Sequence, residues 1–269
     1  MPELPEIEVA RRDLDPQLTG RAISGAIVRE ARLRWRIPPE VGELAGRVVR
    51  AVRRRGKYLL LDCGDGCLIL HLGMSGSLRV VSPGTPAQRH EHFDLLLGDR
   101  VLRLRDPRRF GAVLWVRGDE SRHPLIARLG VEPLSPKFDA SCLRDLVRGR
   151  RTPIKQFLMD GRHVAGIGNI YANESLFVAG VRPTRRARGL SPAECVDLVR
   201  AIKRTLRAAI RAGGSSLRDY VRSDGRPGRF QNRYWVYERE GCPCRRCGAL
   251  IRRRVQGQRA SYYCPTCQR

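Results

Sequence analysis

The sequence predicts an α+β protein, with an N-terminal antiparallel β-sandwich flanked by helices and a helical C-terminal region that ends in a cysteine-bearing β-hairpin. Three observations lead to this class. Short apolar runs punctuated by glycine fill residues 22–117, apolar residues then recur with a helical period, and two Cys-x2-Cys pairs close the chain. With 269 residues and 42% hydrophobic content, the chain can form one large or two ordinary domains. We expect domains at 1–130, 137–230 and 231–269, with a linker at 131–136.

The first expected element is a helix at residues 5–19. Its apolar residues fall on one face and Gly20 is placed to end it. Eight short strands should follow, because short apolar runs at this spacing are typical of an antiparallel sandwich or barrel. Glycine and aspartate between the runs, at 64–66 and 98–99, supply hairpin-turn chemistry. The expected strands are 26–28, 48–52, 58–62, 68–72, 77–81, 93–97, 101–104 and 112–116.

Beyond the linker the pattern becomes helical. Short helices are expected at 139–148 and 152–160, and a glycine-rich turn at 166–169 should open a helix from Ile170 to Ala179. Ser191-Pro192-Ala193-Glu194 is a capping box with proline at the first helical position. We expect the helix that follows it to end at Gly213-Gly214, because glycine favours helix ends.

The charge of the chain points to a polyanionic partner. Lys and Arg number 52 against 27 Asp and Glu, which gives a formal net charge of +25. Nucleic acid is the usual partner of such a chain, and a membrane surface is the alternative. No apolar run approaches the roughly 18 residues that a spanning helix needs. Charges from Glu3 to Arg12 argue against a signal peptide, so we expect an intracellular protein whose nine cysteines bind metal or stay as thiols.

The four C-terminal cysteines have the spacing of a zinc site. Cys244 and Cys247 form one Cys-x2-Cys pair, and Cys264 and Cys267 form the other. Each pair is a tight turn that offers two thiolates to one tetrahedral Zn²⁺ ion, with a β-hairpin between them. Free thiols on an ordinary hairpin are the alternative. We interpret Cys242 as a bystander, and the remaining cysteines as small core residues: Cys63, Cys67, Cys142 and Cys195.

Arginines crowd the expected hairpin. They could enter a DNA groove, or they could simply face solvent: Arg252, Arg253, Arg254 and Arg259, with Gln258 among them.

The chain starts with Met1-Pro2-Glu3-Leu4-Pro5-Glu6. Removal of Met1 would leave the secondary amine of Pro2 at the terminus. An α-amino group has a pKa of about 8, so part of it is unprotonated and nucleophilic near neutral pH. A secondary amine that attacks an aldehyde carbon gives a charged iminium, and the Glu3 carboxyl could shuttle protons beside it. The plain alternative is that Pro5 merely occupies the first turn of a helix.

Five separated stretches and the cysteine tail together resemble one known family. The stretches are Pro2–Glu6, Lys57 within Gly56–Tyr58, His71–Gly76, Asp106–Gly111 and Gly166–Glu174. In this order they are similar to bacterial formamidopyrimidine-DNA glycosylase, a family that repairs 8-oxoguanine, over essentially the whole length. Endonuclease VIII shares the architecture and prefers oxidised pyrimidines. Leu4 is similar to the purine enzymes, because the pyrimidine enzymes typically have glycine there.

The resemblance implies a bifunctional glycosylase and AP lyase with a helix-two-turn-helix domain at 137–230. Pro2 would attack C1′ and Glu3 would assist ring opening. Lys57 would shuttle protons and contact phosphate, and Arg259 would bind the phosphates beside the lesion. Without the other motifs, Lys57 would be interpreted as an exposed residue at a strand end.

The resemblance also implies DNA contacts. Met74, Arg108 and Phe110 would fill the void left by the flipped base, although core packing is the ordinary role of methionine and phenylalanine. Asn169 would bind a backbone phosphate, and Lys155 would approach the same strand. Further implied contacts, whose alternative is a structural role, are His71, His90, Arg150 and Arg151.

Other segments have implied supporting roles. Glu6 would support the terminal motif, Glu174 would lie near the terminal amine, and residues 215–229 would form the loop over the flipped base.

The partner implied is double-stranded DNA that contains oxidised bases, bound by a monomer in the bacterial cytoplasm at the nucleoid. Two alternatives stay open: a glycosylase for oxidised pyrimidines, and a non-catalytic DNA-binding protein that uses only the zinc hairpin and the basic face.

Overall fold

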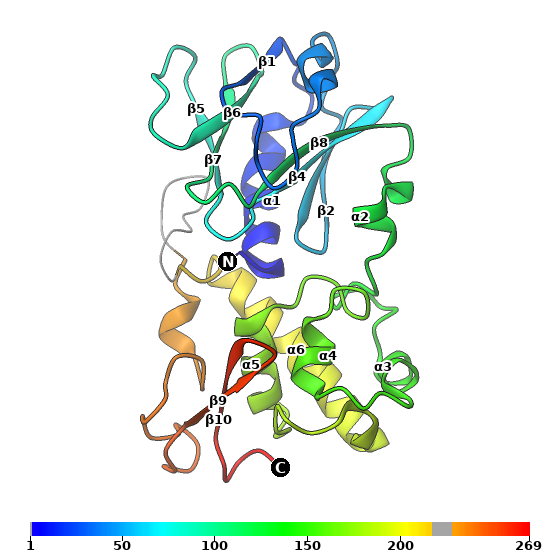
Figure 1. Cartoon of the computed structure of the whole chain (residues 1–269), viewed down its shortest axis with the longest axis vertical. Coiled ribbons are helices and arrows are strands. Elements are labelled where there is room, and N and C mark those ends of the chain that lie inside the picture. Colours follow the sequence, from blue (N-terminus) through cyan, green and yellow to red (C-terminus); the bar gives the residue numbers. More distant parts are fainter. Residues whose placement is uncertain (1, 217–227) are drawn as a thin grey trace. The chain divides into compact units, whose positions relative to one another are not determined.

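A computed structural model describes residues 2–216 and 228–269. The chain divides into two compact units (Figure 1). Unit 1 comprises Met1–Ala127 and Ala212–Gln231, and unit 2 comprises Arg128–Arg211 and Asn232–Arg269. The domain boundaries expected at 130, 137 and 231 stay predictions. Among the described residues, no helix is long and apolar enough to cross a membrane.

Unit 1 contains two four-stranded sheets in which every neighbouring pair is antiparallel. The first sheet has the order β1 (Gly25–Val28), β6 (Glu91–Leu96), β7 (Val101–Arg105), β5 (Ser77–Val81). The second has the order β2 (Ala51–Arg55), β3 (Tyr58–Asp62), β4 (Gly66–His71), β8 (Ala112–Arg117). The predicted sandwich is therefore confirmed.

The second expected strand, 48–52, was placed too early. Val48 bridges Ala22, and the Val49 N–H donates to the Arg21 carbonyl. This part of the apolar run therefore pairs with the chain that follows the first helix. β2 begins only at Ala51, opposite Asp62 of β3. The apolar run at 48–52 therefore pairs with two different segments. Hydrophobic periodicity does not show where one pairing ends and the other begins.

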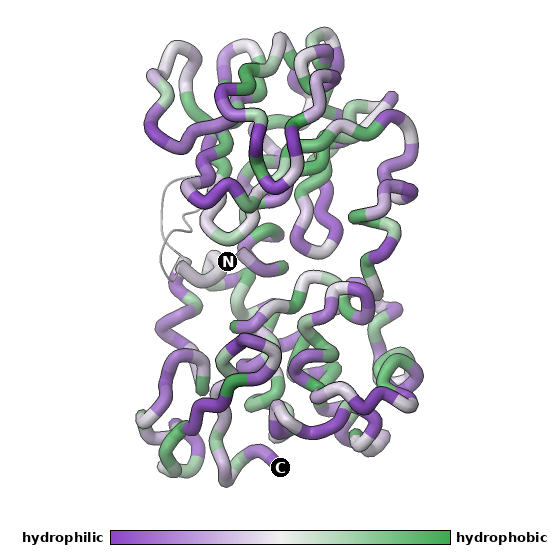
Figure 2. The backbone as a smooth tube through the Cα atoms, in the orientation of Figure 1, coloured by the Kyte–Doolittle hydropathy of each residue, from purple (hydrophilic) through white to green (hydrophobic). Residues whose placement is uncertain are grey.

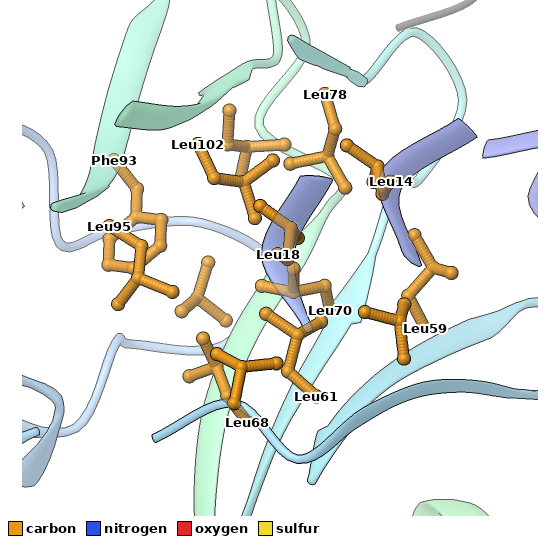
Figure 3. Packing of buried hydrophobic residues seen from close by; sticks show 14 of the residues in the cluster. Leu14, Leu18, Leu59, Leu61, Leu68, Leu70, Leu78, Phe93, Leu95 and Leu102 are labelled. Carbon is orange, nitrogen blue, oxygen red and sulfur yellow. The ribbon is translucent and has the colours of Figure 1, made fainter. Parts of the chain in front are cut away.

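The first helix, α1 (Leu4–Leu18), contributes its predicted apolar face to the core of unit 1. Leu14 and Leu18 lie among leucines of both sheets, including Leu61 and Leu102 (Figure 3). Hydrophobic and hydrophilic stretches are interspersed along the chain (Figure 2).

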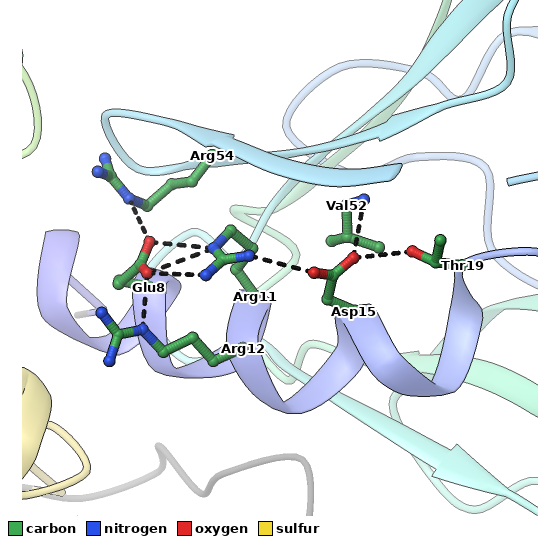
Figure 4. Close-up of polar contacts among 7 residues, drawn as sticks. All are labelled: Glu8, Arg11, Arg12, Asp15, Thr19, Val52 and Arg54. Atoms are coloured by element: carbon green, nitrogen blue, oxygen red, sulfur yellow. Dashed lines mark hydrogen bonds and ion pairs between the residues drawn. The ribbon is translucent and has the colours of Figure 1, made fainter. Parts of the chain in front are cut away.

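Polar contacts attach α1 to β2 (Figure 4). Glu8 accepts hydrogen bonds from Arg11 and Arg12 on its own helix. It also accepts one from Arg54 Nε of β2, at 3.1 Å. Burial alone would raise the pKa of Glu8, but the bonds from Arg11 and Arg12 and the charge of Arg54 outweigh it, so the pKa is lowered. This ion cluster fixes the first turns of α1 against the sheet.

Unit 2 contains the helices expected from the sequence. They are α3 (Ala140–Val147), α4 (Ile154–Met159), α5 (Asn169–Val178) and α6 (Pro192–Arg211). The capping box of α6 is confirmed, because Ser191 and Glu194 exchange side-chain to backbone hydrogen bonds of 2.7 and 3.2 Å.

The sequence missed only very short elements. Three or four consecutive residues are too few for periodicity to appear, and five residues barely suffice. The elements that the sequence missed are η1 (Pro39–Glu43), η2 (Glu120–Arg122), α2 (Pro124–Ala127), η3 (Ala187–Gly189) and η4 (Phe230–Arg233).

The predicted C-terminal hairpin is formed by β9 (Arg252–Gln256) and β10 (Arg259–Tyr263). Its small core includes Phe177 of α5 together with Val236 and Ile251. The cysteine-bearing tail therefore depends on α5 for part of its apolar contacts, as expected of a segment too short for a core of its own.

Candidate functional site

The Pro2-Glu3 segment is held at the start of α1. Both residues are buried, and Glu3 is the N-cap of the helix in a capping box with Glu6. Glu6 Oε2 accepts the Glu3 N–H at 2.8 Å, and its other oxygen accepts the Ser215 N–H at 2.8 Å. One buried carboxylate therefore fixes the backbone beside Pro2 to the chain that follows α6. Met1 lies outside the described residues.

Lys57 lies in the turn between β2 and β3, close to His71 at the end of β4. Tyr58 is directly opposite His71 in the ladder, with their rings 4.8 Å apart. His71 Nδ1 accepts the Gly73 N–H at 3.0 Å, which leaves the proton of the neutral ring on Nε2. Burial, with the charges of Lys57 and Arg34, lowers the pKa of His71 to about 4. His71 is therefore a neutral hydrogen-bond donor near neutral pH.

Two loops of unit 1 are joined by the buried carboxylate of Asp106. It accepts hydrogen bonds from Ser75 Oγ at 3.1 Å and from the N–H groups of Arg108 and Gly111, at 3.3 and 2.7 Å. The backbones approach so closely that a Cβ on Gly73 would lie 2.4 Å from the Phe110 carbonyl carbon. The loop after β4 and the loop after β7 therefore form one structure.

These joined loops carry the three residues expected to fill the void. Met74 is half-buried, and Arg108 and Phe110 are exposed, with 43% of Phe110 accessible. The Arg108 guanidinium lies 4.9 Å from the centre of the Phe110 ring. An exposed phenylalanine under an arginine adds nothing to the core, so a surface role accounts for it better than packing does.

His90 lies on the neighbouring β5–β6 connection. Its backbone has φ +72°, and its carbonyl accepts the Asp106 N–H at 2.9 Å. Its pKa is lowered by desolvation and by the charges of Arg89 and Arg105. His90 is thus attached to the same Asp106 segment as the two loops.

The expected loop at 215–229 lies mostly outside the described residues, and its two described ends belong to unit 1. The Gly228 N–H donates to Ser216 Oγ at 2.8 Å, and the Ser216 N–H donates to Gln231 Oε1 at 3.1 Å. A Cβ on Gly228 would lie 2.4 Å from the Gly214 carbonyl oxygen. Only glycine permits this approach of the two ends.

In unit 2, Asn169 begins α5 directly after the glycine-rich turn, where Gly166 has φ +85°. The N-terminus of this ten-residue helix suits an anion. Lys155 of α4 is buried, with 1% exposed, and its ammonium donates to the Ala260 carbonyl at 2.6 Å and to Ser261 Oγ at 2.8 Å. The structure therefore joins Lys155 to β10, and its DNA contact stays a prediction.

Arg259 is exposed at the first position of β10, beside the Gly257-Gln258 turn. Arg150 is exposed after α3. Glu174 is fully buried in α5, where its oxygens accept three backbone N–H groups from residues 235–237 at 2.8–3.0 Å. Burial raises the pKa of Glu174, and these three hydrogen bonds oppose that rise. Its predicted place near the terminal amine stays a prediction.

The four predicted zinc ligands come together. The sulfur atoms of Cys244, Cys247, Cys264 and Cys267 all lie within 4.8 Å of one another. The sulfur atoms of Cys244 and Cys267 are 4.0 Å apart, and those of Cys247 and Cys264 are 3.4 Å apart. A tetrahedral ion with Zn–S bonds of about 2.3 Å requires roughly 3.8 Å between sulfurs, so the set fits one structural zinc.

The other cysteines take no part in the zinc cluster. Cys242 is exposed; Cys63, Cys67 and Cys195 are buried and Cys142 is half-buried. Burial raises the pKa of Cys63 to about 11 and that of Cys67 to about 12.

Sequence reasoning missed three polar residues that position the others: Asp106 as the loop anchor, Ser215 as the partner of Glu6, and Asn173 within α5. The available signal for Asn173 was its place four residues after Asn169, on the same side of a helix.

Comparison with known proteins gives one consistent family. The formamidopyrimidine-DNA glycosylase N-terminal domain matches residues 1–113, its H2TH domain matches 129–221, and a zinc finger found in FPG and IleRS matches 241–269. A formamidopyrimidine-DNA glycosylase from Thiobacillus denitrificans is 56% identical over all of both chains.

Solved structures agree. MutM (Fpg) from Thermus thermophilus has a TM-score of 0.90 at 42% identity and covers 99% of this chain and 98% of its own. A mutant Fpg from Lactococcus lactis, in complex with DNA that contains Fapy-dG, has a TM-score of 0.92 at 33% identity and covers 100% of both chains.

Proposed function

Because the chain belongs to the formamidopyrimidine-DNA glycosylase family, it is a base-excision-repair glycosylase with AP lyase activity, and we propose that Pro2 is its nucleophile. The enzyme acts on oxidised bases in double-stranded DNA and contains one structural zinc. We further propose oxidised purines as its preferred substrates. We also propose that the enzyme works in the bacterial cytoplasm, at the nucleoid, where its DNA substrate lies.

The proposed reaction begins when the Pro2 nitrogen, exposed by removal of Met1, attacks C1′ of the damaged nucleotide. The C1′–N bond to the base breaks, and the base leaves with a proton. Glu3 exchanges the protons needed for sugar-ring opening. The resulting iminium acidifies the C2′ proton; its loss breaks the C3′–O bond, and a second elimination breaks the C5′–O bond. The observation that supports this proposal best is the capped, buried Pro2-Glu3 segment.

The residues of unit 1 take separate proposed roles. Lys57 shuttles protons and contacts phosphate, and neutral His71 donates its Nε2 proton to a phosphate oxygen. Met74, Arg108 and Phe110 replace the flipped base in the duplex. The exposure of Phe110 and the joining of the two loops by Asp106 support this assignment.

His90 takes the role of a phosphate contact from the segment attached to Asp106.

The residues of unit 2 supply proposed backbone contacts. Asn169 binds phosphate at the N-terminus of α5, while Arg150 and Lys155 approach the DNA backbone. Arg259 binds phosphates beside the lesion and assists the second elimination. The zinc ion supplies no reaction step; the four cysteines hold it so that a short hairpin can present Arg259.

The test is borohydride trapping on two labelled duplexes, one with 8-oxoguanine opposite cytosine and one with thymine glycol opposite adenine. Borohydride reduces the iminium to a stable crosslink. We expect a crosslink mainly on the first duplex, mapped to Pro2. A crosslink mainly on the second duplex would move the preference to oxidised pyrimidines. A protein that retains Met1 quantitatively and is still a full lyase would refute Pro2 as nucleophile.

A non-catalytic DNA-binding role is the second candidate, and the zinc hairpin with its arginines is the observation that favours it. It predicts that acetylation of the terminal amine leaves DNA function intact, whereas the catalytic proposal predicts loss of trapping with DNA binding retained.

A further inference from the structure

Asn173 lies in α5, fully buried, between Asn169 and the zinc hairpin. Its Nδ2 donates to the Asn169 carbonyl at 2.6 Å and lies 3.5 Å from Asn169 Oδ1. Its Oδ1 accepts the Tyr262 N–H of β10 at 2.8 Å. One amide therefore contacts both the first residue of α5 and the strand that begins at Arg259.

The chemistry of the partners fixes the orientation of the Asn173 amide. The Asn169 carbonyl can only accept a hydrogen bond, and the Tyr262 N–H can only donate one. A flipped Asn173 amide would face both with the wrong group. The orientation of Asn169 is biased in turn, because its Oδ1 faces the Asn173 amino group. The amino group of Asn169 then points away from Asn173, and an amino group is what a phosphate oxygen accepts from.

A further contact lies on the same hairpin strand. Ser261 accepts a hydrogen bond from Lys155 of α4 at 2.8 Å and donates to Gln256 Oε1 of β9 at 2.7 Å. Asn173 of α5 therefore holds β10 at Tyr262, and Lys155 of α4 holds it at Ser261. Arg259 lies two residues before Ser261 and three before Tyr262, roughly 7–10 Å along the strand. Its position relative to Asn169 therefore depends on bonds near the middle of the hairpin as well as on the zinc at its base.

We propose that Asn173 is a positioning residue for DNA binding and strand cleavage. It turns the Asn169 amide toward a phosphate and holds β10 so that Arg259 reaches the phosphates beside the lesion. The inference rests on the proposed function of Asn169 and Arg259.

The first experiment compares Asn173→Ala with wild type and with Ser175→Ala. Ser175 is a matched control, because it is fully buried in the same helix and its hydroxyl has no hydrogen-bond partner among the described residues. Asn173→Ala should weaken binding of a lesion duplex about tenfold, the effect of about one buried hydrogen bond. The slope of log K against log salt should decrease in magnitude by about 0.9, because Arg259 then neutralises one phosphate fewer. Ser175→Ala should match wild type.

The second experiment follows the products. Asn173→Ala should increase the share of product stopped after the first elimination, as Arg259→Ala should. In the Arg259→Ala background, Asn173→Ala should shift the product ratio no further, because the two changes act on one interaction. Zinc content equal to wild type in every variant ensures that the finger is folded.

Asn173→Asp keeps the acceptor for Tyr262 but turns a second oxygen toward Asn169, where two acceptors already lie. It should retain zinc and bind DNA less tightly, and its effect on binding should become smaller in the Asn169→Ala background, which removes the side-chain acceptor but keeps the backbone carbonyl. This gentler variant tests the proposal if the alanine variant fails to fold.

The outcomes separate this inference from the function on which it rests. A wild-type enzyme that gives no trapped crosslink refutes the proposed function. An active wild type, with Asn173 variants that lose thermal stability but keep the wild-type salt slope and product ratio, refutes the positioning role. Additive effects of Asn173→Ala and Arg259→Ala on the product ratio also refute it.

Discussion

Replacing Glu6 with alanine should both destabilise unit 1 and slow formation of the iminium. The Glu6 carboxylate is 1% exposed and accepts the N–H groups of Glu3 and Ser215, each at 2.8 Å. Alanine removes this acceptor from two buried donors at once. Because Glu3 is adjacent to Pro2, the loss acts directly on the backbone that carries the proposed nucleophile.

The magnitude follows from the two bonds. A hydrogen bond to a charged group contributes about 1.5–3 kcal/mol, and the loss is not fully additive, so we expect about 2–4 kcal/mol for Glu6→Ala. This is a large share of the 5–15 kcal/mol that typically separates folded from unfolded states. With a urea m value of about 2 kcal/mol/M, the unfolding midpoint should fall by roughly 1–2 M. Glu6→Gln retains one acceptor oxygen and should show about half the loss.

The assay is urea unfolding, followed by the rate of borohydride trapping on an 8-oxoguanine duplex. Glu8→Gln is the matched control on the same helix. Its side chain is 12% exposed and bonds to arginine side chains instead of to the backbone beside Pro2, so its change should also lower the urea midpoint but leave the trapping rate unchanged. If Glu6→Ala unfolds at the wild-type urea concentration, or traps at the wild-type rate, the assignment of Glu6 as a backbone anchor is wrong.

Three further outcomes are expected. Cys247→Ser should release zinc and abolish DNA binding, because the hairpin lacks a sufficient core without its ion; native mass spectrometry and a binding assay measure both, and wild-type affinity would contradict it. Glu3→Gln should bind DNA normally but excise the base more slowly in single-turnover kinetics, and equal rates would remove Glu3 from the mechanism. Burial lowers the pKa of His71 from 6.5 to about 4, so the unfolded chain takes up a proton that the folded chain does not. The stability that this contributes is complete above pH 6.5 and is lost as the pH falls toward 4. His71→Asn should therefore make the urea midpoint depend less on pH between pH 7 and 5. An unchanged pH dependence would contradict the lowered pKa of His71.

The sequence was sufficient for the regular elements of the fold. Short apolar runs punctuated by glycine predicted the strands, because the sandwich buries most residues of strands such as β3 and β4, and the helical period predicted α1 and α6. The failures have a common physical cause. Val48 and Ala51 belong to one apolar run but pair with different segments, and pairing partners are set by long-range contacts that a local pattern does not contain.

The zinc ligands were predictable for a different reason. Two Cys-x2-Cys turns constrain four sulfur atoms locally, so the spacing of Cys244 and Cys247 already specifies half of the site. Lys155 was harder to interpret, because the sequence does not distinguish an exposed lysine from one whose ammonium is bonded inside the protein. Its two bonds to Ala260 and Ser261 join residues more than a hundred positions apart.

The backbone contacts of three buried acidic residues could not be predicted from the sequence, although Glu6 and Glu174 were expected to have supporting roles. Glu6, Asp106 and Glu174 are each at most 1% exposed, and each accepts at least two backbone N–H groups. A buried carboxylate can satisfy several amides at once, whereas a neutral side chain of that size offers fewer acceptors. Such carboxylates suit irregular segments, whose amides lack partners in helices or sheets.

The three carboxylates hold the Pro2-Glu3 segment, the loops of Arg108 and Phe110, and the segment that leads to the zinc finger. A net charge of +25 favours DNA but provides no means of fixing these segments. We infer that the few buried acids position the groups that act on DNA, while the arginines supply the attraction. Substituting them should therefore impair cleavage more than nonspecific binding.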